Sequence, residues 1–375
     1  MSVMDLPMAP TFAAAEEVQD HLTPAEVDSL KDEVRSLAEQ RHAVILAHNY
    51  QVPEIQDVAD YVGDSLGLSR QAAATDAEVI AFCGVHFMAE TASVLCPEKT
   101  VLIPDLDAGC SLAASIDAEQ LAAWKAQYPA GVVVMYVNTT AEVKALTDYC
   151  CTSANAVDVV RHVYATHGAD TEILFGPDMW LGAYVEKELG TRMHVWDGEC
   201  HVHAGIRPAD IEATRAAHPG ADFLIHPECG CTTSVMEYVA AGDISREGVH
   251  MLSTGGMLRY AEQAESAAGR SDGERGQVEE PGLDGSSQAA NETGASSKAR
   301  EVIVATETGM LYPLQMAAPD VDFIAANPRA ACVYMKMITL HKLRDALREM
   351  KFEVRVPPEI AERARVPIDR MVAIG

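Results

Sequence analysis

The sequence predicts an α/β protein whose strands form parallel sheets, and three features of the chain support this fold class. Short runs of continuously apolar residues recur along its length, and such runs are typical of strands that are buried on both faces. Alanine-rich stretches of helical character lie between them, for example at residues 71–75 and 141–146. Strands that alternate with helices favour parallel sheets with helices on both sides.

Each expected element rests on a local pattern. A helix is expected from Pro24 to Glu39, because its apolar residues recur at helical spacing and Thr23 supplies an N-cap signal. The expected strands that follow begin at Ala43, Val79, Val101, Val132, Glu172, His194, Asp222, Val302 and Phe323. Between residues 266 and 297 the only large apolar side chains are Val278 and Leu283, so we expect a disordered surface loop there.

The length of the chain indicates more than one domain. A chain of 375 residues is too long for one ordinary core, and two or three domains are expected. Three domains fit the positions of the strands. We predict them at residues 25–115, 116–205 and 206–340, after a disordered lead at 1–24 and before a C-terminal segment at 341–375 that packs on the first domain.

Composition and charge exclude several classes of function. The formal net charge is −28, from 28 basic and 56 acidic residues, which argues against a nucleic-acid surface. No apolar run approaches the ~18 residues that a membrane-spanning helix needs. The first residues include acidic side chains and no basic segment, so they do not resemble a signal peptide. We expect a cytoplasmic protein whose partners are small molecules.

Three of the nine cysteines follow the same local pattern. Cys110, Cys200 and Cys332 each come after an apolar run, and the carboxyl ends of strands are where such sheets present ligands. Cys200 lies 90 residues after Cys110 and 132 residues before Cys332, and the low-complexity segment accounts for most of this difference. The spacing suggests a repeated unit whose three thiolates hold one cubane iron–sulfur cluster and leave one corner without a protein ligand.

The other cysteines have simpler interpretations. Disulfides are not expected to form a framework in a reducing compartment. Cys229 and Cys231 lie close to His226 and resemble half of a zinc site, but no second half follows at a suitable spacing. Cys83 and the pair Cys150 and Cys151 are expected to pack as small apolar side chains.

Polar residues recur at the ends of the expected strands. Taken singly, a histidine, tyrosine or asparagine at such a place is more often structural than catalytic. Their joint recurrence indicates a site, and the residues concerned are His48, Tyr50, Ser65, Tyr136, Asn138, Ser153, His203, His226, Glu228 and Thr254. On spacing alone, either His201 or His203 could face the cluster.

Together these stretches resemble the quinolinate synthase family of iron–sulfur enzymes, which acts in de novo NAD biosynthesis. The matching motifs occur in the family's order and cover roughly residues 40–345. They are Ala47-His-Asn-Tyr50, Gly63-Asp-Ser65, Ala108-Gly-Cys-Ser111, Tyr136-Val-Asn138, Cys151-Thr-Ser-Ala-Asn155, Trp196-Asp-Gly-Glu-Cys200, His226-Pro-Glu-Cys229, Ser253-Thr-Gly-Gly-Met257, Thr306-Glu-Thr-Gly309 and Cys332-Val-Tyr-Met-Lys336.

The resemblance implies a fold, a cofactor and a reaction. The family has three pseudo-symmetric αβα three-layer domains around a central [4Fe–4S] cluster, with one cysteine ligand from each domain. It is a transferase that condenses iminoaspartate with dihydroxyacetone phosphate to give quinolinate, phosphate and water, and functional coupling to L-aspartate oxidase is expected. The family also runs directly across the segment after Tyr260, so Tyr260 and Val302 are expected to lie near each other.

The resemblance also implies roles for individual residues. The metal ligands would be Cys110, Cys200 and Cys332. The catalytic candidates are Tyr50, Glu228, His203 and His226, with Tyr50 the first choice for acid–base work, Glu228 its alternative, and His203 favoured over His201 by the family's Cys-x-x-His pattern. The substrate-binding candidates are His48, Ser65, Tyr136, Asn138, Ser153 and Thr254.

Two other functions share part of this pattern. An iron–sulfur hydro-lyase that dehydrates a small hydroxy acid would use the same cluster but would need no phosphate site. A cluster carrier or redox-responsive regulator is less favoured, because the clustered cysteines of bacterial ferredoxins and a basic DNA-reading element are both missing from the sequence.

Overall fold

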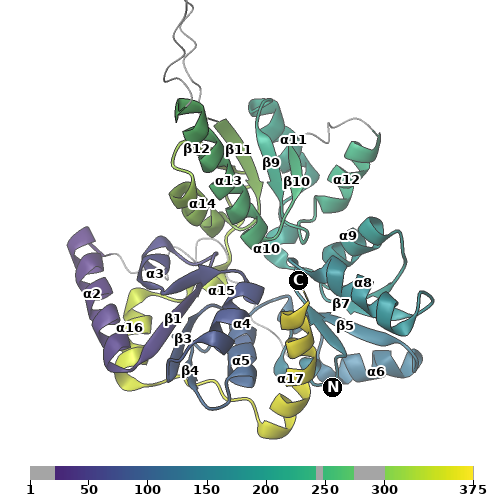
Figure 1. Cartoon of the computed structure of the whole chain (residues 1–375), viewed down its shortest axis with the longest axis horizontal. Coiled ribbons are helices and arrows are strands. Elements are labelled where there is room, and N and C mark those ends of the chain that lie inside the picture. Colours follow the sequence, from purple (N-terminus) through teal and green to yellow (C-terminus); the bar gives the residue numbers. More distant parts are fainter. Residues whose placement is uncertain (1–21, 242–247, 274–299, 375) are drawn as a thin grey trace, which may run out of the picture.

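A computed structural model describes residues 22–241, 248–273 and 300–374 of the chain. Its framework is three parallel four-stranded sheets, each flanked by helices, which form three lobes in Figure 1. The strand orders are β2-β1-β3-β4, β6-β5-β7-β8 and β10-β9-β11-β12, so all three sheets have one topology. The predicted α/β class with three αβα units is therefore confirmed.

The first sheet follows a long N-terminal helix. Thr23 and Glu26 form a capping box, in which the Thr23 N–H donates to the Glu26 carboxylate at 2.8 Å, so the helix begins where the sequence predicts. Strand β3 is buried at all five positions, as its apolar sequence indicates. The elements are α2 (Pro24–Gln40), β1 (Ala43–His48), α3 (Pro53–Val58), β2 (Tyr61–Gly63), α4 (Ser65–Ala74), β3 (Val79–Cys83), α5 (His86–Leu95) and β4 (Thr100–Leu102).

The second sheet repeats this pattern of strands and crossover helices. Its first strand is paired with both the second and the third, as in the first sheet. The elements are a 3-10 turn η1 (Ala113–Ser115), α6 (Ala118–Gln127), β5 (Val132–Tyr136), α7 (Ala141–Lys144), β6 (Tyr149–Cys151), α8 (Ala156–His167), β7 (Ile173–Gly176), α9 (Met179–Leu189), β8 (His194–Val195) and α10 (His201–Ala204).

The third sheet contains the predicted low-complexity segment. We expected residues 266–297 to be disordered, but helix α13 continues to Gly273, so residues 266–273 are helical. Residues 274–297 lie outside the described residues. Arg300 donates to the Tyr260 hydroxyl at 2.6 Å, which places the two flanks of the segment together as predicted. The elements are α11 (Pro208–Ala217), β9 (Asp222–Ile225), α12 (Thr232–Ala241), β10 (Val249–Met251), α13 (Thr254–Gly273), β11 (Arg300–Ala305), a 3-10 turn η2 (Thr308–Met310), α14 (Leu311–Ala317), β12 (Val321–Ala325) and α15 (Val333–Lys336).

The C-terminal segment contacts two of the three sheets and their helices. Helix α16 (Leu340–Glu349) packs on α2 and β3. Helix α17 (Pro358–Ala373) instead lies between α4 and α5 on one side and α7 and β6 on the other (Figure 1). The Asn155 side-chain amide donates to the carbonyls of Met371 and Ile374 at 3.0 and 2.7 Å, which fixes the end of this helix on the second unit. The exact boundaries of the three domains stay a prediction.

Cys229 and Cys231 form a disulfide, with Cα atoms 5.2 Å apart, so they are neither free thiols nor half of a zinc site. Within the described ranges, no helix combines the length and the apolar character that crossing a membrane requires.

Candidate active site

The carboxyl ends of all three sheets open into one cavity of about 70 Å³. Because the sheets share one topology, equivalent strand ends supply equivalent parts of its wall. Every site residue predicted from the sequence lines this cavity. They are His48, Tyr50, Ser65, Cys110, Tyr136, Asn138, Ser153, Cys200, His203, His226, Glu228, Thr254 and Cys332.

The repeat explains which residues meet. The first strand of each sheet leads to the larger polar side chains, the second strand leads to a hydroxyl side chain, and the fourth leads to a cysteine. Ser65, Ser153 and Thr254 follow β2, β6 and β10, respectively, at the start of a helix or shortly before one. The cavity is thus a junction of three units, and no single unit could form it.

Tyr50 lies at the centre of a hydrogen-bonded group that joins all three units. Its hydroxyl is 3.2 Å from Nε2 of His203 and 2.7 Å from Oγ1 of Thr306, and these two atoms are 2.9 Å apart. All three side chains are buried. Thr306 was not among the predicted site residues, although the Thr306-Glu-Thr-Gly309 motif contained the signal that could have identified it.

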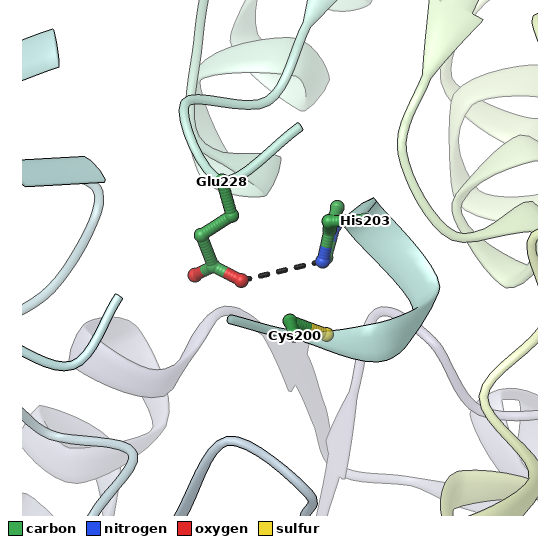
Figure 2. Close-up of side chains that lie close together, drawn as sticks. All are labelled: Cys200, His203 and Glu228. Atoms are coloured by element: carbon green, nitrogen blue, oxygen red, sulfur yellow. Dashed lines mark ion pairs between the residues drawn. The ribbon is translucent and has the colours of Figure 1, made fainter. Parts of the chain in front are cut away.

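Glu228 faces His203 and Cys200 from the opposite loop (Figure 2). One of its carboxylate oxygens lies 3.3 Å from Nδ1 of His203, although the contact lacks hydrogen-bond geometry. The other accepts a hydrogen bond from the Tyr136 hydroxyl. Burial raises the pKa of Glu228 to about 8, since charge is costly away from water. Glu228 can therefore exist as either acid or carboxylate near neutral pH.

Three histidines and two tyrosines of the cavity are held neutral. Burial lowers the pKa of His48 and His203 to about 3, and it lowers the pKa of His226 well below its usual range. Burial also raises the pKa of Tyr50 and Tyr136 well above 10, assisted by the nearby Glu228 carboxylate. The cavity is consequently lined by neutral imidazoles and phenols.

Hydrogen bonds orient several of these side chains. Nε2 of His226 lies 3.1 Å from the Ser153 hydroxyl, and its ring stacks on that of His203 with centroids 4.8 Å apart. The Asn49 amide donates to the Thr254 hydroxyl at 3.0 Å. Asn138 lines the cavity with a buried Oδ1 atom that has no hydrogen-bond partner among the described residues, so it offers an acceptor to a bound molecule.

The three predicted metal ligands fit a metal cluster by their chemistry and position. Cys110, Cys200 and Cys332 are free, partly exposed and line the same cavity. Burial raises the pKa of each thiol, and the pKa of Cys200 is raised further by Glu228, Cys110 and Cys332. Sulfur donors that interact with one another in one cavity are the set that an iron–sulfur cluster requires.

A second metal-binding arrangement shares one of these cysteines. Ligand atoms of Cys200, His203 and Glu228 all lie within 4.8 Å of one another (Figure 2). Such a set could hold a single metal ion, but it would leave Cys110 and Cys332 unused in the cavity wall. The three-cysteine set takes one cysteine from the end of the fourth strand of each sheet, so it follows the threefold repeat.

His201 and His203 occupy different places. Nδ1 of His201 lies 2.6 Å from the Ser111 hydroxyl, and its ring faces Tyr334 edge-on. His201 is half-buried, whereas His203 is buried against Tyr50 and Thr306. The structure therefore joins His203, and not His201, to the hydrogen-bonded group around Tyr50.

Comparisons with known proteins match most of the chain to one family. The family model described as "Quinolinate synthetase A protein" matches residues 32–270 and 274–373. A quinolinate synthase of Thermus thermophilus is 51% identical over 348 residues, which cover 93% of this chain and 98% of the relative. Those of Mycobacterium sp. strain KMS and Mycobacterium tuberculosis are 51% and 52% identical over 363 and 344 residues, covering 96% and 92% of this chain and 96% and 88% of the relatives.

Proposed function

Because the chain belongs to the quinolinate synthase family, we propose that it condenses iminoaspartate with dihydroxyacetone phosphate to give quinolinate, phosphate and two waters. One observation carries this proposal. The residues that the family resemblance selects are scattered over more than 280 positions, from His48 to Cys332, and they line one small cavity.

We propose that Cys110, Cys200 and Cys332 hold a [4Fe–4S] cluster at this cavity. When bound, the cluster supplies a Lewis acid at its iron without a protein ligand, which can polarise an oxygen or nitrogen atom of a substrate. The three free cysteines fit this role. We also propose that the protein works in the cytoplasm, where such thiols stay reduced and available to iron.

The cavity binds anionic groups without a lysine or arginine side chain. None lines it among the described residues, so carboxylates and phosphate must be held by neutral donors. Ser65 is the first residue of α4 and Thr254 is the first of α13, where backbone N–H groups favour anions. We assign substrate binding to these residues with His48, Tyr136, Asn138 and Ser153.

We assign proton transfer to Tyr50 and Glu228, with His203 between them. Nε2 of His203 contacts the Tyr50 hydroxyl, and Nδ1 approaches the Glu228 carboxylate. Tyr50 remains the first candidate for acid–base work because of its position, since its hydroxyl lies in the cavity between His203 and Thr306. Burial raises the pKa of its phenol, so Tyr50 carries its proton at neutral pH. Glu228, with a pKa of about 8, can take a carbon-bound proton and return it.

His226 completes the catalytic group in this proposal. Stacked on His203 and bonded to Ser153, it fixes the plane of the His203 ring and lines the substrate cavity. We also propose functional coupling to L-aspartate oxidase, since iminoaspartate hydrolyses in water and needs a nearby source.

The activity can be tested directly. Anaerobically reconstituted protein, given dihydroxyacetone phosphate and an imine formed from oxaloacetate and ammonia, should produce quinolinate that mass spectrometry detects. The same protein without iron and sulfide should produce none. A hydro-lyase would dehydrate a hydroxy acid without requiring dihydroxyacetone phosphate, and that outcome would replace the proposed reaction.

A further inference from the structure

The third strand of each sheet is followed by a position that the repeat makes equivalent. This position is two residues beyond the end of β3, β7 and β11, and it is occupied by Val85, Asp178 and Glu307. The two carboxylates are 0% and 1% exposed. Burying a carboxylate is costly unless it accepts several hydrogen bonds, so the donors around each one are informative.

Asp178 binds the backbone of the cysteine in its own unit. Its Oδ2 atom accepts a hydrogen bond from the Cys200 N–H at 3.1 Å. Its Oδ1 atom accepts from the N–H groups of Trp180 and Leu181 at 2.7 and 3.0 Å and so caps α9. One buried side chain thus joins the start of α9 to the loop that carries Cys200.

Glu307 has the same relationship to the cysteine of the third unit. Its Oε1 atom accepts from the Cys332 N–H at 2.8 Å, and its Oε2 atom accepts from the Gly309 N–H at 2.7 Å. Lys336 lies 3.0 Å from Oε1 and also donates to the carbonyl of Tyr50. A side chain at Gly309 would come within 2.8 Å of these groups, so the packing here is close.

The two cysteines held in this way share one backbone conformation. Cys200 precedes the short helix α10 with φ −78° and ψ 116°, and Cys332 precedes α15 with φ −85° and ψ 105°. The first unit differs, because Val85 has no acceptor side chain. There the neighbouring N–H of His86 donates to the carbonyl of Ala108 at 2.8 Å, so a backbone bond holds the loop before Cys110.

We propose that Asp178 and Glu307 are positioning residues, which fix the backbones of Cys200 and Cys332 so that both sulfur atoms are set for the cluster before it binds. The inference rests on the three-cysteine cluster proposed above. Groups that orient metal ligands typically change metal retention about 10- to 100-fold when they are altered. Glu307 also connects the loop of Cys332 to the loop of Tyr50, because Lys336 contacts both the Glu307 carboxylate and the Tyr50 carbonyl. A proposed cluster ligand is thereby linked to a proposed catalytic residue.

The test compares Asp178→Asn and Glu307→Gln with a matched control, Asp148→Asn. Asp148 also accepts a backbone N–H, that of Val133 at 2.8 Å, but at the opposite end of the second sheet. The full-length proteins are reconstituted anaerobically, and the loss of absorbance near ~400 nm is followed after addition of an iron chelator. The electron paramagnetic resonance spectrum of the reduced protein gives a second readout.

We expect both variants to lose the cluster about tenfold faster than the unaltered protein, with a changed resonance spectrum, while Asp148→Asn behaves as the unaltered protein does. Thermal unfolding of the cluster-free proteins shows which variants fold. If either Asp178→Asn or Glu307→Gln does not fold, the rate of cluster loss in the variant that does fold tests the inference. Folded variants with the unaltered rate and spectrum would overturn the inference, as would equally fast loss in Asp148→Asn. Unaltered protein that never takes up iron would contradict the proposed cofactor instead.

Discussion

The Tyr50 hydroxyl lies 3.2 Å from Nε2 of His203, and the two residues come from different units of the chain. The bond exists only when the first and second sheets are brought together at the cavity. His203 in turn lies 3.3 Å from Glu228 in the third unit. The proton transfer that we propose for Tyr50 and Glu228 would therefore depend on the relative placement of all three units.

Changing Tyr50 to Phe should leave the cluster in place and reduce kcat by about 100-fold or more, because the acidic proton is lost while the ring still packs. The bond between His203 and Thr306 at 2.9 Å does not involve the phenol and should persist. Steady-state kinetics on protein with measured iron content provides the test. Tyr164→Phe, which loses a hydroxyl bonded to Thr191 away from the cavity, is the control.

The same experiment separates Tyr50 from Glu228. Normal turnover in Tyr50→Phe together with an inactive Glu228→Gln would transfer the acid–base role to Glu228 and leave Tyr50 as a packing residue. Loss of the cluster in Tyr50→Phe would show instead that the phenol supports the metal site.

Each of Cys110→Ser, Cys200→Ser and Cys332→Ser should abolish the absorbance near ~400 nm and the activity together, because a cluster held by three thiolates has no spare ligand. Cys229→Ser and Cys231→Ser should keep the absorbance, since those sulfur atoms are bonded to each other. Iron and sulfide analysis checks both expectations. A Cys200→Ser protein with a full cluster and normal turnover would refute the ligand assignment.

The cluster-free protein should become less stable as the pH falls below about 6.5. His48 and His203 have folded-state pKa values of about 3, so below the unfolded value near 6.5 the unfolded chain binds more protons. Each such histidine contributes about 1.4 kcal/mol per pH unit to this loss. In His48→Asn the free energy of unfolding, measured by denaturant titration from pH 5 to 7, should fall less steeply as the pH is lowered. The same pH dependence as in the unaltered protein would show that burial does not lower the pKa of His48.

Glu228 should act in the opposite direction. Its folded-state pKa of about 8 lies above the unfolded value, so the folded protein binds the extra proton between these values and loses stability as the pH rises. In the same titrations extended to pH 8.5, Glu228→Gln should remove the loss of stability that this carboxyl group causes between about pH 4.5 and 8. The same pH dependence in Glu228→Gln and in the unaltered protein would show that Glu228 ionises normally.

Residues 274–297 should be dispensable for turnover, because their composition offers few apolar side chains for a core. Helix α13 ends at Gly273, 13 residues beyond Tyr260, and β11 begins at Arg300 against Tyr260. A replacement must therefore return along roughly 20 Å of helix, which about ten Gly and Ser residues can span. Kinetics and iron content after the replacement should be unchanged, and loss of the cluster would show that the segment supports the site.

The central strands were predictable because their residues are continuously apolar, as in β3 and β5. The second strand of each sheet was not predicted, since β2, β6 and β10 have three residues each and contain no run of aliphatic side chains. The site residues could be predicted from strand ends and motifs. Asp178 and Glu307 could not be predicted in this way. They accept hydrogen bonds from the backbone N–H groups of Cys200 and Cys332, and a backbone donor carries no sequence signal, so these contacts are known only from the folded structure.

The contact of α17 with two units also could not be predicted. Its apolar face indicates a buried helix, but the surface that buries it is formed by segments far away in the sequence. The bonds from Asn155 to the carbonyls of Met371 and Ile374 depend on the same arrangement. Long-range packing of this kind leaves no local signal.

Mössbauer spectroscopy of protein reconstituted with iron-57 tests the central claim most directly, because it counts and distinguishes the irons. With the three cysteines as ligands, we expect a [4Fe–4S] signal in which one iron in four changes when quinolinate is added, since one corner has no protein ligand. A single iron per chain, retained in Cys110→Ser and Cys332→Ser and lost in Cys200→Ser, would instead identify the mononuclear set of Cys200, His203 and Glu228 and contradict the three-cysteine cluster.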